Sequence, residues 1–468
     1  MIYGGTIVKF CSDNLYAKMK VIIKGEIMKT ANQNIKPITT CINAEGNIEI
    51  GGCDLTELAN EYGTPLYVFD EATIRSMTKS YKDAFKSYPK MKMMFASKAF
   101  MTKAICKIMQ QEDFGLDLCS GGEIYTAKSA GFDMSKTLFN GNNKTYEELN
   151  MALEYGVGTI SVDNFFELAL LNNLAEAQNK NIRVLLRITP GIECHTHEYI
   201  QTGHLDSKFG FDLAQVDEAI ELIKDEYKNL NLIGLHAHIG SQIFEKKVYY
   251  DEVGVIFGEI KRIKEKHNIF LSEINLGGGL GIKYTEKDAP ISVYEIAETI
   301  INSIEEHSAK YEIEAPFVFI EPGRSIVGTS GVTLYTAGSS KQVPNGRKYQ
   351  SVDGGMSDNV RPSMYQAEYT VEIANKPNEK ADAKVTISGK HCESGDILAK
   401  DIMLPEIEEG DIVCFYNTGA YGYSMSSNYN RVLKAAAVLV NNGKSDIIVS
   451  RQTYDELCGS DVIPDRLN

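Results

Sequence analysis

Short apolar runs alternate with amphipathic stretches along the chain from about residue 91. The amphipathic stretches, such as 102–111, 145–156 and 163–178, repeat apolar residues at the three-to-four-residue spacing of helices, whereas the runs have the length of buried strands. Strict alternation of the two signals indicates βα units with parallel strands and right-handed crossovers. The runs are 91–98, 115–120, 137–141, 159–163, 183–190, 232–240, 273–279 and 317–323.

Eight βα units within about 235 residues match the size of a (β/α)₈ barrel, although a doubly wound open sheet produces the same alternation. After Arg324 the pattern changes to β-prone runs separated by Gly, Pro, Asn and Asp, which is typical of a β-sandwich or barrel-like domain. The segment 41–52 indicates a hairpin that joins this domain. The β-prone runs are 331–337, 349–355, 367–374, 383–389, 411–417 and 431–440.

We therefore expect an α/β barrel combined with an all-β domain. Residues 1–40 show little sustained periodicity and are interpreted as a variable N-terminal extension. Residues 41–70 are expected to be N-terminal strands that join the β domain. Residues 71–325 are expected to form the barrel, and residues 326–468 the C-terminal β domain.

The composition narrows the class of protein. With 43% hydrophobic and 24% charged residues, the chain has the composition of a soluble globular protein with a large core. A formal net charge of −15 without a basic stripe argues against nucleic-acid binding. No apolar run approaches the roughly 20 residues that cross a bilayer, and the N-terminus lacks the pattern of a signal peptide. Nine scattered cysteines without metal or redox spacing indicate a reducing cytoplasm.

One lysine stands at the end of the first predicted barrel strand, in Ser97-Lys98-Ala99. Functional side chains of such barrels come from the carboxyl ends of the strands and from the loops that follow. A lysine that points into the barrel mouth is costly unless the protein uses it, but a lysine taken alone is more often a surface residue. The other strand ends therefore decide how Lys98 is interpreted.

Those strand ends carry groups suited to a phosphorylated aromatic cofactor. The glycine-rich turn 277–281 leaves backbone N–H groups free to cradle a phosphate, and Ser241 and Arg324 could donate to the same dianion. Glu321 could accept a hydrogen bond from a protonated ring nitrogen, and the His238 imidazole could lie against the ring. A lysine, a phosphate cradle and a carboxylate for a pyridinium are together the groups that pyridoxal 5'-phosphate requires.

Several motifs, in the same order along the chain, resemble the fold-type III pyridoxal phosphate-dependent decarboxylases, most closely the branch that acts on diaminopimelate. The resemblance extends over about residues 41–432, and it implies a (β/α)₈ barrel of the alanine racemase type followed by a β domain. The motifs are FASKAF (95–100), GLDLCSGGE (115–123), HTHEYIQTGHLDSKFG (195–210), GLHAHIGSQ (234–242), NLGGGLG (275–281), EPGR (321–324), CESGD (392–396) and GAYGYSMSSNYN (419–430).

The resemblance also implies the cofactor ligands. Lys98 would form the Schiff base with the cofactor, His238 would stack on the pyridine face, and Glu321 would bind the ring nitrogen. Asp117, at the end of the second strand, lies near the lysine in this superfamily; a buried structural carboxylate is the alternative. The other implied cofactor-binding residues are Ser241, Gly278, Gly279, Pro322, Gly323, Arg324 and Tyr421.

A second set of residues separates these decarboxylases by substrate. By resemblance, Arg361 and Tyr365 bind the distal carboxylate of diaminopimelate together with Arg324. Glu393 is implied to bind the distal ammonium. Tyr421 contacts both cofactor and substrate. A surface ion pair is the alternative interpretation of Arg361.

The reaction that the resemblance implies is decarboxylation of meso-2,6-diaminopimelate to L-lysine and CO₂, the final step of lysine biosynthesis. Cys392 is the implied acid that delivers the final proton, and Lys98 is the competing candidate. In this family the CESGD segment comes from the neighbouring subunit, so we expect a homodimer with composite active sites. The loop 193–210 is a candidate lid over the substrate.

Other interpretations stay open at this point. A decarboxylase for ornithine, arginine or lysine is the nearest one, although Glu393 and Arg361 disfavour it. An amino-acid racemase would lack CESGD, and a non-enzymatic pyridoxal phosphate-binding protein would end after a single barrel. The two His-x-His pairs, 195/197 and 236/238, suggest a metalloenzyme, but no third ligand follows them at a recognisable spacing.

Overall fold

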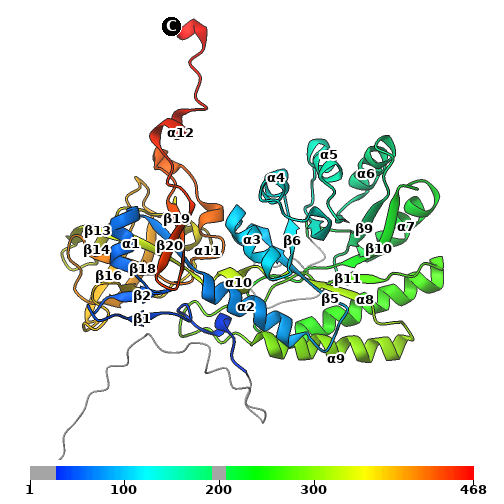
Figure 1. Ribbon diagram of the computed structural model, residues 1–468, viewed down its shortest axis with the longest axis horizontal. Coiled ribbons are helices and arrows are strands. Elements are labelled where there is room, and N and C mark those ends of the chain that lie inside the picture. The colour runs from blue at the N-terminus through cyan, green and yellow to red at the C-terminus, as the bar shows by residue number, and fades with distance from the viewer. Residues whose placement is uncertain (1–27, 192–206) are drawn as a thin grey trace, which may run out of the picture.

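In the computed structural model, which describes residues 28–191 and 207–468, eight parallel strands close into a barrel beside a β-rich domain (Figure 1). The last barrel strand pairs with the first, so the sheet has no edge. Each predicted apolar run contributes one strand, which confirms the barrel and rules out the open sheet. The strands are β5 (Met91–Ala96), β6 (Gly115–Leu118), β7 (Thr137–Phe139), β8 (Thr159–Val162), β9 (Ile182–Arg187), β10 (Leu230–His236), β11 (Glu273–Asn275) and β12 (Phe317–Ile320).

The barrel strands are apolar runs because both of their faces are covered. One set of side chains packs together as a separate buried cluster and comes from five strands, as expected of a layer that fills a barrel interior. The neighbouring residues on the strands pack outward against the helices in the main core. The interior cluster consists of Met94, Leu138, Leu185, Ile233 and Phe319.

Helices alternate with the strands, and most of them begin at polar capping residues. The Thr102 hydroxyl accepts a hydrogen bond from the Ile105 N–H at 3.2 Å, and Thr145 forms a capping box with Glu148. The helices expected at 102–111, 145–156 and 163–178 are confirmed to within two residues at each end. The helices of this region are α2 (Glu71–Ala84), α3 (Lys103–Gln111), α4 (Gly121–Ser129), α5 (Tyr146–Tyr155), α6 (Phe165–Ala177), α7 (Val216–Asp225), α8 (Lys246–His267), α9 (Val293–Tyr311) and α10 (Arg324–Val327).

The second domain is built on a nine-stranded sheet whose main path runs β17-β16-β14-β13-β4-β19-β20, with β18 and β15 branching from β13. The sequence pattern missed β17 and β20, because β17 carries charged residues and register shifts and β20 is a largely exposed edge strand. The strands are β4 (Leu66–Asp70), β13 (Gly331–Gln342), β14 (Lys348–Val352), β15 (Val371–Ile373), β16 (Ala383–Ser388), β17 (Ile397–Leu404), β18 (Ile412–Phe415), β19 (Ala436–Asn441) and β20 (Lys444–Val449).

The chain that precedes the barrel contributes to this second domain. Strand β4 lies between β13 and β19, so residues far apart in sequence share one sheet. The hairpin expected at 41–52 forms a separate three-stranded sheet of β1 (Cys41–Ile42), β2 (Ile48–Ile50) and β3 (Cys53–Asp54). The Ile48 N–H donates to the Ala374 carbonyl at 2.8 Å and ties this sheet to the large one. A helix that the pattern did not predict, α1 (Leu55–Tyr62), follows β3 and is capped by Asp54.

The two domains meet at the carboxyl ends of the barrel strands. The Tyr421 N–H donates to the Ala99 carbonyl at 2.7 Å, and the Ser424 hydroxyl donates to the same carbonyl at 3.1 Å. The short helix α11 (Arg361–Tyr365) belongs to the second domain, and α12 (Tyr454–Cys458) leads into a C-terminal segment that extends away from the body (Figure 1). No helix in the described part of the chain combines the length and apolar character needed to cross a bilayer.

Candidate active site

A cavity of about 510 Å³ lies at the carboxyl ends of the barrel strands, where the second domain meets them. Most of the residues singled out in the sequence line it, although they come from distant parts of the chain. Those lining residues are Lys98, His238, Ser241, Gly278, Gly279, Glu321, Gly323, Arg324, Arg361, Tyr365 and Tyr421.

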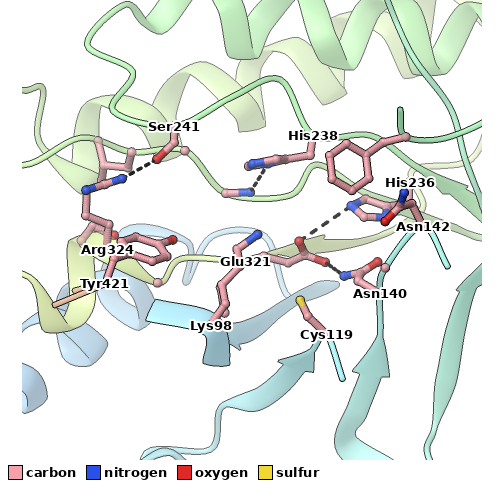
Figure 2. Close-up of a pocket in the computed structure, with 18 of the residues that line it drawn as sticks. Lys98, Cys119, Asn140, Asn142, His236, His238, Ser241, Glu321, Arg324 and Tyr421 are labelled. Carbon is pink, nitrogen blue, oxygen red and sulfur yellow. Dashed lines mark hydrogen bonds and ion pairs between the residues drawn. The ribbon is translucent and has the colours of Figure 1, made fainter. Parts of the chain in front are cut away.

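Lys98 belongs to a 3₁₀ turn, Ser97–Ala99, directly after β5. Its neighbours in the turn are buried, whereas its own side chain is accessible through the cavity. Figure 2 shows it reaching toward the space between Glu321 and Tyr421. The lysine therefore enters the barrel mouth and does not lie on the outer surface.

The electrostatic surroundings of Lys98 favour the charged amine. Burial alone would lower its pKa, but Cys119, Tyr421 and the carboxyl groups of Asp117 and Glu321 outweigh burial and raise the pKa above its ordinary value. Burial also raises the pKa of the Cys119 thiol, so this group is neutral near pH 7. Burial also raises the pKa of Asp117 well above its ordinary value. Glu321 is then the negative partner that holds Lys98 as an ammonium.

Glu321 follows β12 and is held by two amide groups. Its Oε1 accepts hydrogen bonds from Asn275 Nδ2 at 2.7 Å and from Asn140 Nδ2 at 3.1 Å. Its Oε2 lies 3.7 Å from His236 Nε2 (Figure 2). Burial raises the pKa of Glu321, and Lys98 and the two amides limit that rise. The carboxylate thus has a fixed orientation within the cavity wall.

Asp117 lies behind the cavity wall and does not line the cavity. It is 1% exposed, and its Oδ1 accepts a hydrogen bond from Asn140 Nδ2 at 2.5 Å. Burial, and after it the charge of Glu321, raises the pKa of Asp117 well above its ordinary value. Asp117 is therefore a buried carboxyl that favours its neutral form and contacts Asn140 behind the cavity wall.

His238 follows β10 and faces the cavity as a neutral ring. Burial and the charges of Lys98 and Arg187 lower its pKa well below the ordinary value. Its Nδ1 accepts a hydrogen bond from the Gly278 N–H at 3.3 Å, so the ring hydrogen is on Nε2 (Figure 2). A neutral imidazole of fixed tautomer can lie flat against an aromatic ring.

The expected phosphate cradle combines glycines with an arginine and a serine. A Cβ on Gly279 would lie 2.7 Å from the Gly240 carbonyl oxygen, and one on Gly323 would lie 2.9 Å from the Ala96 Cβ, so neither position admits a side chain. Arg324 Nη2 donates to the Ser241 Oγ at 2.9 Å (Figure 2). These groups form a wall that fits a phosphate.

Two further partners support this wall. Arg324 Nη1 donates to the Tyr284 hydroxyl at 2.5 Å. Pro322 is buried and does not line the cavity; its carbonyl oxygen accepts a hydrogen bond from the Ala96 N–H at 3.1 Å. Pro322 thus supports the strand end and does not face the cavity.

Two buried guanidinium groups flank the ring of Tyr421. The Cζ of Arg324 lies 4.8 Å from the ring centroid, and that of Arg361 lies 5.6 Å from it. Arg361 also lies 5.1 Å from the Tyr365 ring and donates through Nε to the Tyr369 hydroxyl at 3.1 Å. Within the described residues neither guanidinium forms an ion pair, although buried arginines are usually paired. Both cations are therefore available to an anionic ligand.

The backbone of Tyr421 holds this ring in place. Its φ of 62° lies in the left-handed region, which side-chain-bearing residues adopt rarely. The hydrogen bond from its N–H to the Ala99 carbonyl, at 2.7 Å, stabilises that conformation. The second domain thereby presents the ring beside the turn that carries Lys98.

Cys392 and Glu393 lie outside the cavity of their own chain and are exposed. Their loop nevertheless has a defined shape. The Cys392 N–H donates to the Asn430 Oδ1 at 3.1 Å, and the Asp396 carboxylate accepts a hydrogen bond from the His391 N–H at 2.9 Å. A structured loop thus presents both side chains to the solvent.

Several residues that line the cavity were not singled out from the sequence as site residues. Each lies at the carboxyl end of a barrel strand or within three residues after it. The signal in the sequence was a polar side chain in the last part of a predicted apolar run or directly after that run. These lining residues are Cys119 and Asn140 after β6 and β7, Asn142 two residues later, Arg187 at the end of β9 and His236 at the end of β10.

Two expectations fall on residues outside those that the structure describes. The His195/His197 pair lies there, as does most of the candidate lid 193–210. Within residues 28–191 and 207–468, no group of three or more His, Cys, Asp or Glu side chains is arranged to hold a metal ion. His236 has Ser161 as its neighbour, with 2.7 Å between Nδ1 and the hydroxyl oxygen.

Comparisons with known proteins agree with this geometry. Residues 71–328 match the family model described as "Pyridoxal-dependent decarboxylase, pyridoxal binding domain". Diaminopimelate decarboxylase of Bacillus subtilis is 49% identical over 90% of this chain and 96% of its own length, and that of Synechocystis is 46% identical over 95% and 97%. The crystal structure of diaminopimelate decarboxylase from M. jannaschii in complex with L-lysine superposes with a TM-score of 0.86 at 35% identity, covering 92% of this chain and 99% of that one.

Proposed function

The chain belongs to the pyridoxal-dependent decarboxylases and, among them, to the diaminopimelate decarboxylase family, and we propose that it converts meso-2,6-diaminopimelate to L-lysine and carbon dioxide. This reaction is the final step of lysine biosynthesis. The observation that supports the substrate most strongly is the pair of buried guanidinium groups, Arg324 and Arg361, that have no carboxylate partner among the described residues. A phosphorylated cofactor and a dicarboxylic substrate would together neutralise both.

The residues around the cavity fit pyridoxal 5'-phosphate. Lys98 would hold it through Nζ, Glu321 would contact the ring nitrogen, and His238 would lie against the ring face. Close packing at Gly279 and Gly323, where a Cβ would meet neighbouring atoms, leaves bare backbone to approach a phosphate. The phosphate would be held by Ser241, Gly278, Gly279, Gly323 and Arg324.

The cofactor's own contribution is an electron-poor ring that takes up the electron pair left behind when carbon dioxide departs. Glu321, held as a carboxylate by two amides and by Lys98, would keep a proton on the ring nitrogen. Tyr421 contacts both arginines, so it would be shared between the cofactor side and the substrate side of the cavity. Asp117 would hold the Asn140 carboxamide in place from behind the wall.

Arg361 and Tyr365 would orient the substrate by its distal carboxylate, and Glu393 by its distal ammonium. Anchoring the end that does not react would fix the orientation of the scissile Cα–carboxylate bond for reaction. Cys392 would then deliver a proton to the Cα that has lost its carboxylate. The Lys98 ammonium is the alternative donor.

We further propose a homodimer in which Cys392 and Glu393 complete the partner's active site. Both side chains are exposed on a structured loop and neither lines the cavity of its own chain. In this arrangement the barrel domain, 71–325, binds the cofactor, and the domain 326–468, joined by 41–70, supplies the substrate contacts. We place the enzyme in the cytoplasm, since the nine cysteines of the sequence are scattered and have no metal or redox spacing.

Spectroscopy and product analysis test the function directly. The purified protein with pyridoxal phosphate is expected to show a visible absorbance band, and borohydride reduction followed by peptide mapping should locate the cofactor on Lys98. With meso-diaminopimelate the product should be lysine, and ornithine should react far more slowly. Absence of the band, or release of putrescine from ornithine at an equal rate, would contradict the proposal.

Hybrid dimers test the composite site. Mixed Lys98→Ala and Cys392→Ala chains form dimers of which half are hybrids, and each hybrid contains one intact site. Mixing the two inactive variants should therefore restore about one quarter of the parental activity, because a two-fold dimer exchanges equivalent residues. If the mixture stays as inactive as either variant alone, Cys392 acts within its own chain.

A further inference from the structure

The carboxamide of Asn140 bridges two buried carboxyl groups at the cavity wall. Its Nδ2 donates to Asp117 Oδ1 at 2.5 Å and to Glu321 Oε1 at 3.1 Å. Asn140 itself is 5% exposed and follows β7, and its backbone N–H donates to the Leu118 carbonyl at 2.7 Å. The ends of three barrel strands, β6, β7 and β12, are thus joined through one amide group.

The two ends of this bridge are not equivalent. Glu321 Oε1 accepts a second amide hydrogen bond, from Asn275 at 2.7 Å, whereas Asn140 is the only hydrogen-bond donor to the Asp117 carboxyl within the described residues. The carboxyl group with more donors is the better anion. Asp117 is therefore the carboxyl group that favours the protonated form, and Glu321 carries the negative charge.

The orientation of the amide supports this interpretation. Asn140 Oδ1 is buried and has no partner among the described residues. A buried carbonyl oxygen without a donor is destabilising. The two hydrogen bonds that the Asn140 amide donates therefore explain why an asparagine occupies this position. An apolar residue of similar size would fill the same space without leaving an unpaired oxygen.

We infer that Asn140 is a positioning residue for Glu321, which keeps the negative charge on Glu321 and leaves Oε2 as the oxygen that faces the cofactor ring nitrogen. This inference rests on the proposed function, because it assigns Glu321 to the ring nitrogen. The other charged or titratable groups that act on this pair are Lys98, Cys119, Glu123, Arg187, Glu252 and the neutral His236.

Two substitutions separate positioning from space filling. Asn140→Ala removes the donor and leaves a small cavity, whereas Asn140→Asp keeps the shape and replaces the donor with a third carboxyl group. If Asn140 positions Glu321, both variants should shift the pH dependence of the bound cofactor's absorbance, and kcat should fall roughly 10- to 100-fold, the effect of losing one charge-assisted hydrogen bond. The KM for diaminopimelate should change less than about threefold.

A buried asparagine away from the cavity provides the matched control. Asn172 is 6% exposed and accepts one hydrogen bond from the Asn229 N–H at 3.2 Å. Asn172→Ala should lower the melting temperature without moving the cofactor absorbance or its pH dependence. This comparison separates general destabilisation from a change at the ring nitrogen.

The outcomes distinguish the inference from the function on which it rests. If the parental protein itself shows no cofactor absorbance, the proposed function fails. If the parent is normal and Asn140→Asp keeps the parental absorbance, pH dependence and kcat while only Asn140→Ala is impaired, Asn140 fills space and the inference is wrong. If Asn140→Ala does not fold, the isosteric Asn140→Asp variant still distinguishes the two roles of Asn140. Positioning of Glu321 predicts that this variant is impaired, whereas space filling predicts that it is normal.

Discussion

The substitution Arg361→Met tests how the enzyme recognises its substrate. Arg361 is 8% exposed, and its only hydrogen bond among the described residues goes from Nε to the Tyr369 hydroxyl at 3.1 Å. Methionine has similar length and no charge, so it can fill the site between Tyr365 and Tyr421. The change therefore removes a cation and its fork of donors with little loss of packing.

The expected effect on catalysis is much larger than the effect on folding. A charge-assisted hydrogen bond contributes about 1.5–3 kcal/mol, and a guanidinium that holds a carboxylate in bidentate fashion makes two. A loss of about 3–4 kcal/mol corresponds to a roughly 10²–10³-fold fall in kcat/KM. The free energy of unfolding should change by less than about 2 kcal/mol, because one hydrogen bond is lost while a buried unpaired charge is removed.

Inhibition by L-lysine, compared with inhibition by cadaverine, gives the decisive measurement. L-Lysine retains the distal carboxylate of the substrate, whereas cadaverine lacks it. Arg361→Met should weaken inhibition by lysine about as much as it lowers kcat/KM, and should leave inhibition by cadaverine within about threefold of the parent. The kcat/KM of Arg361→Lys and its inhibition by lysine should lie between those of the parent and those of Arg361→Met, because an ammonium keeps the charge but loses the planar fork of donors.

Either of two results would refute this assignment. If Arg361→Met weakened inhibition by lysine and inhibition by cadaverine equally, Arg361 would support the shape of the cavity and would not bind the carboxylate. Unchanged inhibition by lysine would mean that another cation binds that group.

Three further predictions concern the proton donor, the cofactor cradle and the pH dependence of stability. Cys392→Ala should lower kcat by ~10²–10⁴ with little change in KM, and a variant with normal turnover would remove Cys392 from the mechanism. Gly323→Ala places a Cβ 2.9 Å from the Ala96 Cβ; at about 1–3 kcal/mol for such overpacking, titration of the apoprotein should show markedly weaker pyridoxal phosphate binding. Burial raises the pKa of Asp358 to about 7, so the folded state binds this proton more tightly than the unfolded state, and stability should decline as pH rises from ~4 to ~7. Asp358→Asn should remove that decline and stabilise the protein at pH 8 by up to a few kcal/mol in denaturant titrations; an unaltered pH profile would contradict the assignment.

The sequence by itself determined the barrel and most of its chemistry. Strands covered on both faces must be continuous apolar runs, and such runs can be recognised without knowing their neighbours. Since functional residues of a barrel follow the strand ends, Lys98 and Glu321 could be placed at its mouth from position alone. The same logic applies to Asn140 and His236, which directly follow or end their strands, although neither was singled out from the sequence as a site residue.

Only the tertiary structure decided which of these groups meet. The two hydrogen bonds of Asn140 join side chains from three strands, and no local pattern contains that geometry. The sequence pattern also missed β17 and β20, because an exposed or bulged strand gains its stability from its partners rather than from its own apolar residues. Likewise, the exposure of Cys392 and the lack of an ion-pair partner for Arg361 among the described residues depend on long-range packing, which brings together residues far apart in the chain.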